Sequence, residues 1–449
     1  MTDDNTAPRP LRRVLIVSPH FPPVNAPDMQ RVRMSLPYLR QHGWAPTVLA
    51  LHPDSVEGAV VEPLLEGSYP ADVRVIRVRG LSPRFTRWAG VGNLWWRCGR
   101  AFTQAGDRLL RQEKFDLVFL STTQFSAFQL GPRWLRRFGV SYVLDYQDPW
   151  INPYYRRTGT RPPGGPIRYA LSQWQARRIE PTALRLAGGI ISVSDAYGPG
   201  LAESYPWFDP TRVELLPFGA SPADFAALGD YRPARPLVDF DDGCFHHVYT
   251  GRFGFDMAFA MQILMRAFKL YLESHPEEAR RTRFHLIGTD YAPPPLGRER
   301  ALPVARAEGV ADYVREHGGR VPYFDALYYL RRAQALIALG SDDPTYSASK
   351  IFPYILAQRP MLLIYHQRSP VLDLARRADA GVRFGFSGPE DLDRLAAEVH
   401  REWFAGTRRQ HYAGFDAAAF HPFAAETLTA KLAAVFDRSA KLRPGHPSQ

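Results

Sequence analysis

The stretch from Ala335 to Pro360, ALIALGSDDPTYSASKIFPYILAQRP, contains a short apolar run, a polar loop and a helical pattern in direct succession. The apolar run at 336–339 is typical of a parallel strand that is buried on both faces. Ser349 is a suitable N-cap for a helix that begins near Lys350. A helix start beside the carboxyl end of a parallel strand favours anions, because free backbone N–H groups and the helix dipole meet there. The stretch therefore predicts an open α/β sheet with a candidate phosphate site, although an ordinary strand-to-helix connection would show the same pattern.

Short apolar runs alternate with helical patterns on both sides of this stretch. Before it, we expect strands at 245–250, at 283–287 and within 314–321, and helices at 257–274, 304–309 and 324–333. After it, we expect a strand at 361–365 and a helix from Pro370. The helical pattern at 389–436 is long enough to close this half of the chain and cross back over the first half.

The first half of the chain shows the same alternation. We expect strands at 13–18, 46–51, 73–78, 117–120, 142–146 and 189–193, and helices at 29–41, 102–112 and 167–187. Strands that alternate with helices imply a mainly parallel, doubly wound sheet. The fold class is therefore α/β, with two Rossmann-like doubly wound domains that face a central cleft.

A change of composition separates the two halves. Residues 217–242 are rich in Pro, Gly, Ala and Asp, which is typical of an interdomain connection. We therefore expect a first domain at 11–220, a linker at 221–243, a second domain at 244–400 and returning helices at 401–437.

The overall composition is that of an ordinary globular protein. Of 449 residues, 45% are hydrophobic and 22% are charged, which excludes wholesale disorder and a fibrous chain. No apolar run approaches the roughly 18 residues of a membrane span, and the polar N-terminus lacks a signal-peptide core, so we expect a cytoplasmic protein. Cys98 and Cys244 match no metal-ligand or redox spacing, and we expect reduced thiols.

The net charge of +11 favours anionic partners such as phosphates, nucleic acid or acidic lipid. The basic residues are scattered, however. We find no zinc-finger spacing, no aromatic-glycine motif of an RNA-recognition sheet and no basic helix joined to heptads. Nucleic acid is therefore the weaker alternative, and we expect no nucleic-acid partner.

Several short motifs resemble, in their order and spacing, those of the GT-B glycosyltransferases, specifically the retaining family-four type that uses nucleotide-sugar donors. The resemblance covers nearly the whole chain and rests on Val14–Pro23, His42–Leu49, Phe115–Val118, Asp145–Trp150, Val213–Gly219, Tyr249–Arg252 and Ser349–Tyr354. It implies that the N-terminal domain binds the acceptor and that the C-terminal domain binds most of the donor. The hexosyltransferase type and the retention of anomeric configuration are implied by the resemblance alone.

On the donor side, the resemblance assigns Arg252 to the diphosphate of the nucleotide sugar. A guanidinium fork can hold two phosphate oxygens and offset the charge that gathers on the leaving group, although a surface arginine often follows a strand. Lys350 would add a second cation, and the chemistry would need no metal or other cofactor. The other residues expected to bind substrate in this domain are Gly251, Asp342, Asp343, Ser347, Ser349 and Ser369.

The sequence also departs from the family pattern. The family has two glutamates separated by seven residues, and the matching positions here are Thr345 and Pro353. Proline cannot accept a ribose hydroxyl proton, and it is comfortable only in the first turn of a helix. Either Asp342 or Asp343 takes over a sugar or ribose contact, or the site is degenerate and the protein is a non-catalytic sugar-nucleotide-binding or scaffolding protein.

On the acceptor side, Asp145 and Asp148 follow the fifth expected strand. A carboxylate at Asp148 could accept the proton of an attacking hydroxyl or orient a sugar, but an aspartate before proline is also a common turn residue. His20 is a second candidate in the first loop. Asn25 and Gln124 complete the expected substrate-binding set.

The segment from Arg84 to Arg100 mixes tryptophan with arginine and contains no acid. Such a mixture favours the headgroup region of an anionic bilayer, so a lipid-linked acceptor at the inner membrane surface is plausible. The alternative is an insertion whose tryptophans pack on the N-terminal domain. The function expected overall is sugar transfer from a nucleotide diphosphate to a hydroxyl acceptor in cell-surface polysaccharide or glycolipid assembly.

Overall fold

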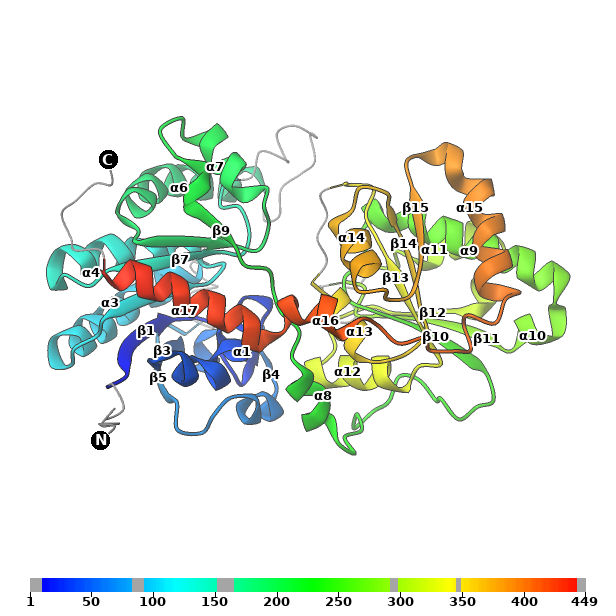
Figure 1. Ribbon diagram of the computed structural model, residues 1–449, viewed down its shortest axis with the longest axis horizontal. Coiled ribbons are helices and arrows are strands. Elements are labelled where there is room, and N and C mark those ends of the chain that lie inside the picture. Colours follow the sequence, from blue (N-terminus) through cyan, green and yellow to red (C-terminus); the bar gives the residue numbers. More distant parts are fainter. Residues whose placement is uncertain (1–9, 83–92, 152–164, 291–297, 345–348, 442–449) are drawn as a thin grey trace, which may run out of the picture. The chain divides into compact units, whose positions relative to one another are not determined.

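The chain forms two compact units in the computed structural model, which describes residues 10–82, 93–151, 165–290, 298–344 and 349–441. The first unit contains Met1–Gly219 together with Ala425–Gln449, and the second contains Ala220–Ala424. Figure 1 follows the chain through both units from blue to red. Each unit is built around its own parallel sheet with helices on both faces, so the prediction of two Rossmann-like units is confirmed.

The described residues of the first unit form a seven-stranded sheet in the order β5-β3-β1-β6-β7-β8-β9, with every pair parallel. Its central strands are apolar because both faces are covered. On β1, Leu15 and Val17 join one hydrophobic cluster while Val14 and Ile16 join the other. The strands are β1 Arg12–Val17, β3 Trp44–Leu51, β5 Arg74–Val78, β6 Leu117–Ser121, β7 Tyr142–Tyr146, β8 Gly189–Ser192 and β9 Val213–Leu215.

Two helices from opposite ends of the chain cover one face of this sheet. They are α1 Gln30–Leu39 and the last helix, α17 Ala425–Lys441, which crosses the sheet of the first unit in Figure 1. Phe436 of α17 packs edge-on against Trp44 and Phe119, with ring centroids 5.4 and 5.1 Å apart. The other face is covered by α3 Leu94–Gln112, α4 Leu130–Phe138 and α6 Pro166–Leu186.

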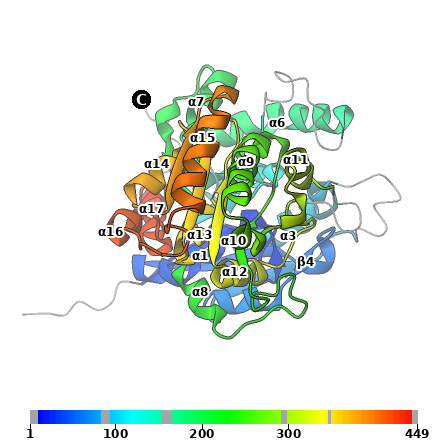
Figure 2. The ribbon, with the colours of Figure 1, turned by 90° about the vertical axis from the view of Figure 1, so that its right-hand side faces the viewer.

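The second unit has a six-stranded parallel sheet in the order β12-β11-β10-β13-β14-β15. Its largest hydrophobic cluster lies under α9 Ala258–Ser274, α11 Leu302–Ala307 and α15 Leu392–Val399, which lie together in Figure 2. The other helices are α12 Tyr323–Arg332, α13 Ile351–Leu356 and α14 Pro370–Arg377. The strands are β10 Phe245–Thr250, β11 Thr282–Ile287, β12 Val314–His317, β13 Ala335–Leu339, β14 Met361–His366 and β15 Val382–Phe386.

Some elements differ from the sequence-based expectation. Residues 221–243 lie in the second unit, where they include α8 Pro222–Leu228, and the Tyr231 hydroxyl donates to Asp325 at 2.5 Å. The helical pattern expected at 389–436 is interrupted: α15 ends in a π turn at His400–Phe404, and the chain is irregular until the short helix α16 Ala417–Phe420. Gly414, with φ +87°, adopts a conformation that no helix contains.

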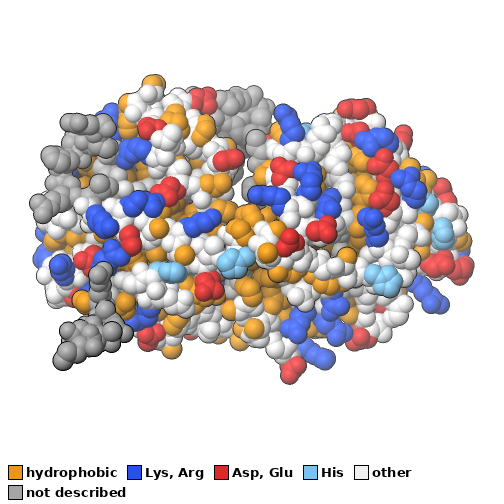
Figure 3. Space-filling view, viewed as in Figure 1, with side chains coloured by type: hydrophobic (Ala, Val, Ile, Leu, Met, Phe, Trp, Pro, Cys, Tyr) orange, Lys and Arg blue, Asp and Glu red, His pale blue; other side chains and the backbone are white. Residues whose placement is uncertain are grey.

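No helix within the described ranges is long and apolar enough to cross a membrane. On the face drawn in Figure 3, lysine and arginine side chains are scattered among acidic ones and form no single stripe.

Candidate functional site

In the second unit, a glycine turn follows the carboxyl end of β10. Gly251 has φ +114°, a conformation that L side chains rarely adopt, and a Cβ there would lie 3.6 Å from Cδ of Lys350. The turn therefore requires glycine and brings the backbone against the lysine stem. The next residue, Arg252, is the predicted diphosphate ligand.

Lys350 lies beside an aromatic ring at this turn. Its Nζ is 4.0 Å from the ring centroid of Tyr249 and donates a hydrogen bond to the Tyr249 hydroxyl. That hydroxyl in turn donates to the carbonyl oxygen of Arg252 at 2.5 Å. One chain of contacts thus connects the two predicted cationic residues.

The charge of Lys350 is destabilised by its surroundings. Desolvation and, to a lesser extent, the positive charge of Arg252 lower the pKa of its ammonium, the nearby carboxylate of Asp256 offsets part of the effect, and the resulting pKa is about 7. Arg252 pairs with Asp256 at 3.2 Å and is itself partly exposed, so this ion pair is weak. Two cations close enough to perturb one another form a site that an anion would stabilise.

A buried tyrosine holds Lys350 in register with the end of β10. The Tyr354 hydroxyl accepts from the backbone N–H of Thr250 at 2.7 Å and donates to the carbonyl of Thr250 at 3.2 Å. Tyr354 is on α13, which begins directly after Lys350. Sequence reasoning missed Tyr249 and Tyr354, although a tyrosine among apolar residues usually needs a partner for its hydroxyl.

The start of α13 differs from the prediction. Ser349 is exposed and does not cap the helix; the N-cap position is Lys350, which makes no side-chain cap, and the carbonyl of Ser349 accepts from the N–H of Phe352 at 3.2 Å. Pro353 is therefore the third residue of the helix, inside the first turn, where its missing N–H leaves no intrahelical bond unmade.

The remaining predicted donor residues have different surroundings. Asp342 is exposed, its N–H donates to the carbonyl of Asp256 at 2.9 Å, and desolvation followed by the charge of Asp256 raises the pKa of its carboxyl. The N–H of Asp343 donates to Ser341 at 3.0 Å. Ser369 is buried and caps α14 by accepting from the N–H of Val371 at 3.2 Å. Ser347 and Thr345 lie outside the described residues.

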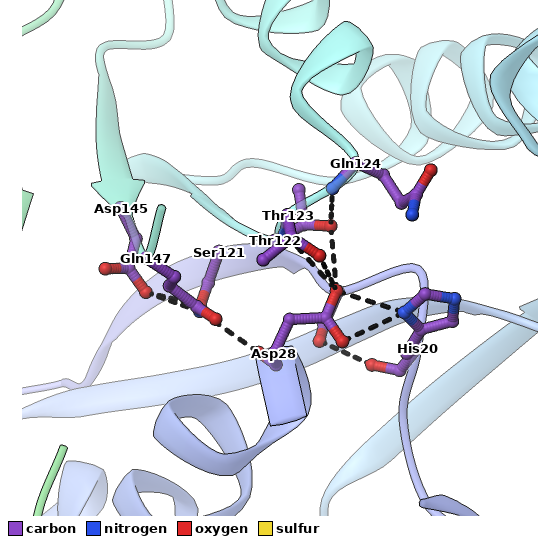
Figure 4. A network of polar contacts seen from close by, with 9 residues as sticks. His20, Asp28, Ser121, Thr122, Thr123, Gln124, Asp145 and Gln147 are labelled. Carbon is purple, nitrogen blue, oxygen red and sulfur yellow. Dashed lines mark hydrogen bonds and ion pairs between the residues drawn. The ribbon is translucent and has the colours of Figure 1, made fainter. Parts of the chain in front are cut away.

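In the first unit, a buried aspartate organises the loops that follow β1 and β6 (Figure 4). Asp28 accepts from Nδ1 of His20 at 2.9 Å and from the hydroxyls of Thr122 and Thr123 at 3.2 Å each. Burial alone would raise the pKa of the Asp28 carboxyl, but the charge and hydrogen bond of His20 and the donors of Thr123 outweigh it, so the pKa is lowered. An ionised Asp28 fixes the orientation of the His20 ring.

A second buried carboxylate lies behind this one. Asp145 accepts from Nε of Arg31 at 2.8 Å, from the Ser121 hydroxyl at 2.8 Å and from the amide of Gln147 at 2.9 Å. The same Gln147 amide donates to the backbone carbonyl of Asp28 at 3.0 Å, which connects the Asp145 carboxylate to the backbone of Asp28 (Figure 4). Asp145 therefore supports the site and is fully buried beneath it.

Asp148 is exposed at the end of the same loop. Desolvation and the negative charge of Asp28 raise the pKa of the Asp148 carboxyl above its ordinary value. Gln124 joins the network through its backbone, whose N–H donates to the Thr122 hydroxyl at 2.8 Å. Figure 4 shows no dashed line from its side chain to the other labelled residues. Asn25 is buried and donates to Glu62 at 2.5 Å, where the short strands β2 Val24–Asn25 and β4 Val60–Val61 pair.

The structure thus brings together two groups of predicted residues. One contains Gly251, Arg252 and Lys350 with Asp342 near Asp256, and the other contains His20 and Asp148 around Asp28. Sequence reasoning missed Asp28, whose partners come from a loop about a hundred residues away. Among the described residues, no group of three or more His, Cys, Asp or Glu side chains is arranged to hold a metal ion.

Comparison with known proteins agrees with this architecture. Residues 30–219 match the family model described as a glycosyl transferase 4-like domain. Anabaena HepE, solved in complex with UDP-glucose, is 12% identical with a TM-score of 0.57, over 95% of this chain and 99% of that one. A UDP-forming α,α-trehalose-phosphate synthase from Burkholderia xenovorans is 15% identical with a TM-score of 0.58, over 96% and 100%. No curated protein matches the chain in sequence.

The two parallel sheets and these structural likenesses define a protein with the GT-B glycosyltransferase fold. Within it, the first unit carries a glycosyl transferase 4-like domain.

Proposed function

We propose that this chain is a glycosyltransferase that moves a sugar from a nucleotide-diphosphate donor to a hydroxyl acceptor. The observation that carries the proposal is the pair of cations at the end of β10, where the charge of Arg252 acts on Lys350 and Tyr249 joins the Lys350 ammonium to the backbone carbonyl of Arg252. The match of the first unit to a glycosyl transferase 4-like domain supports the same class of reaction. HepE, which shares the fold, has been solved with UDP-glucose, which supports a nucleotide-sugar donor.

In this proposal the two cations act on the diphosphate. When the bond between the sugar and the diphosphate breaks, negative charge gathers on the leaving phosphate oxygens. The Arg252 guanidinium and the protonated Lys350 ammonium stabilise that charge more strongly in the transition state than in the bound donor. A bound diphosphate also restores the proton of Lys350, since an opposite charge raises the pKa of an amine.

His20 and Asp148 are the proposed acceptor-side groups. Asp28 orients the His20 ring, and the carboxyl of Asp148 has a raised pKa, so either group could take or hold the proton of an acceptor hydroxyl. Retention of anomeric configuration and hexosyl transfer are part of the proposal and are inherited from the family resemblance. In that mechanism the leaving diphosphate helps to accept the proton.

Donor binding tests the proposal directly. We expect one of a panel of UDP-, GDP- and TDP-sugars to raise the melting temperature of the full chain, and Arg252→Ala and Lys350→Ala to remove the shift. Arg376→Ala is a matched control, because Arg376 is an exposed arginine on α14 that pairs with Asp373. If no donor stabilises the protein, the transferase proposal is wrong.

A specific observation favours a second candidate, a non-catalytic sugar-nucleotide-binding or scaffolding protein. Pro353 occupies a family glutamate position and, inside the first turn of α13, offers no acceptor for a ribose hydroxyl. Asp342 and Asp343 are the proposed substitutes. Donor hydrolysis by the wild-type chain, lost in Asp342→Asn or Asp343→Asn, favours the enzyme; donor binding without any release of nucleotide favours the scaffold.

A lipid-linked acceptor at a membrane surface, in polysaccharide or glycolipid assembly, is a further part of the proposal. Trp96 on α3 and Trp174 on α6 are each more than half exposed, and Trp174 lies 4.9 Å from the Arg178 guanidinium. Trp95, by contrast, packs toward Phe102, and much of the tryptophan-arginine segment lies outside the described residues. Flotation with anionic liposomes, weakened in Trp96→Ala and Trp174→Ala but retained in Trp207→Ala, would support it; equal flotation of all variants would not.

A further inference from the structure

The second unit contains a pocket of about 360 Å³ that shares one lining residue, Tyr354, with the surroundings of the candidate donor site. It lies at the amino ends of β14 and β15, where Met361 and Val382 contribute to its wall. Lys350 and Arg252 follow the opposite, carboxyl edge of the same parallel sheet. The two sites therefore lie at opposite edges of one sheet.

The charged lining of this pocket is strongly basic. Arg359, Arg383 and Arg408 line it together with a single acid, Asp379. Arg359 donates through Nε to the carbonyl of Arg331 at 2.7 Å, and burial together with the charges of Arg331 and Arg332 lowers the pKa of its guanidinium. Arg331 and Arg332 do not line the pocket, but an anion bound beside Arg359 would offset the positive charge that they add there.

The acids near the pocket neutralise this charge only weakly. Arg408 is 4.0 Å from Glu402, and Arg383 is 3.4 Å from Asp379, whose side chain is mostly exposed. Both are long contacts for ion pairs and lie at the solvent boundary, where such pairs contribute little. Arg383 also donates to the carbonyls of Ala375 and Ala380 at 3.2 and 3.3 Å, so the phosphate ligands that we consider are Arg359 and Arg408.

The wall that carries Arg408 is firmly anchored. In Figure 1 the chain between α15 and α16 passes beneath the sheet of the second unit. The neighbouring Arg409 is buried, donates to the Tyr271 hydroxyl at 2.6 Å and stacks over the rings of Phe245 and Tyr271. The N–H of Asp416 donates to the carbonyl of Ala378 at 2.7 Å. These inward contacts hold the segment while Arg408, His411 and Tyr412 line the pocket.

Aromatic residues contribute to the rest of the wall. Tyr412 and Phe415 line the pocket from the anchored segment, and Tyr354 lines it from α13. Such surfaces contact the face of a sugar or a base, while guanidinium forks bind phosphate oxygens in pairs. The volume is within the range of pockets that enclose small molecules.

We propose that this pocket is a second binding site, which takes a small phosphate ester carrying one ring, with the phosphate held by Arg359 and Arg408. The ligand is distinct from the donor of the transfer reaction and binds at the amino edge of the sheet, whereas Lys350 and Arg252 follow the carboxyl edge.

Calorimetric titration of the full chain tests this site, with glucose 6-phosphate and UMP as probes and with glucose and uridine as their uncharged counterparts. The Arg252→Ala, Lys350→Ala double variant serves as the host, because its donor site is disabled. We expect at least one phosphate ester to bind this host, and the further changes Arg359→Ala and Arg408→Ala to weaken binding about tenfold or more, as expected when hydrogen bonds to a charged group are lost.

Two controls keep the result interpretable. Arg376→Ala in the same host should bind the phosphate ester as the host does, and each variant should keep the host's cooperative melting transition. Arg359→Lys should retain part of the affinity, because an ammonium keeps the charge but loses the fork. The proposal is overturned if no phosphate ester binds the host, if the uncharged counterpart binds equally well, or if the Arg359 and Arg408 variants bind unchanged. Since the host lacks the donor cations, failure of the donor assay would leave this result intact.

Discussion

At the scale of single residues, the protonation of Lys350 is the most consequential property of the candidate site. Its pKa of about 7 places the loss of charge near neutral pH, and only the charged form attracts a phosphate. We therefore predict that affinity for a nucleotide-diphosphate sugar is highest below pH 7 and falls as the pH rises from 7 to 9. Titration calorimetry at a series of pH values measures this. Lys350→Arg should flatten the profile because a guanidinium stays charged, and a flat wild-type profile would contradict the prediction.

A buried acid in the first unit gives a second pH-dependent prediction. Glu180 accepts from the hydroxyls of Tyr146 and Tyr205 at 3.0 and 2.8 Å, and burial raises the pKa of its carboxyl to about 7. The folded state therefore binds a proton more tightly than the unfolded state, so the contribution of Glu180 to the free energy of unfolding is fully present below pH 4.5. It is lost as the pH rises through 7, by an amount on the order of 3 kcal/mol.

Comparison with Glu180→Gln isolates this effect from other titrating groups. The difference in the free energy of unfolding between wild type and Glu180→Gln should shift by most of that amount in favour of the variant between pH 5 and pH 8. Denaturant titrations at the two pH values give the numbers. A constant difference across this range would show that Glu180 titrates normally.

At the scale of elements, the hydroxyl of Tyr354 on α13 is hydrogen-bonded to the backbone at the end of β10. Tyr354→Phe removes the hydroxyl that satisfies both the N–H and the carbonyl of Thr250, so it leaves buried backbone groups unpaired. We predict a loss of about 1 to 3 kcal/mol in the free energy of unfolding and weaker donor binding, because Lys350 is no longer held in register with Arg252. Tyr69→Phe in the first unit is the control. Unchanged stability and unchanged donor affinity of Tyr354→Phe would refute this role.

The same elements show how much the sequence determines. The apolar runs that became β1, β13 and β14 are predictable because a strand buried on both faces needs continuous hydrophobic residues. The strand β15, with sequence VRFGF, escapes prediction because its arginine and glycine break that run. The helical pattern expected across 389–436 is interrupted in the structure for the opposite reason, because the local pattern does not reveal the turn at Gly414.

The site was predictable only in part, for a physical reason. Arg252 and Lys350 follow local strand and helix signals, so their elements place them. The contacts that position them, such as Tyr354 with Thr250, join residues about a hundred positions apart, as does the contact of Asp28 with Thr122. Such pairings depend on the strand order of the sheet, which the sequence pattern does not state.

At the scale of the whole molecule, the first unit is completed by the last helix of the chain. Phe436 on α17 is fully buried against Trp44 and Phe119. We predict that Phe436→Ala destabilises the first unit by about 3 to 5 kcal/mol, whereas Phe255→Ala, at a ring that is 76% exposed, changes the free energy of unfolding by less than about 0.5 kcal/mol.

Hydrogen exchange locates the effect of these substitutions. In Phe436→Ala, amides of β1, β3 and β6 should exchange faster while those of β10, β13 and β14 are unchanged, because the two groups of strands belong to different units. Faster exchange of both groups alike would contradict an independent first unit.

The position of α17 also determines when, during translation, the first unit can be completed. A ribosome that has released residues 1–219 must still translate the whole second unit before α17 emerges. At about 5 to 20 residues per second this takes on the order of 10 to 40 s. Throughout that interval the apolar sheet face later covered by Phe436 is bare on a tethered nascent chain, so a pause in elongation within the second unit would prolong its exposure and favour aggregation.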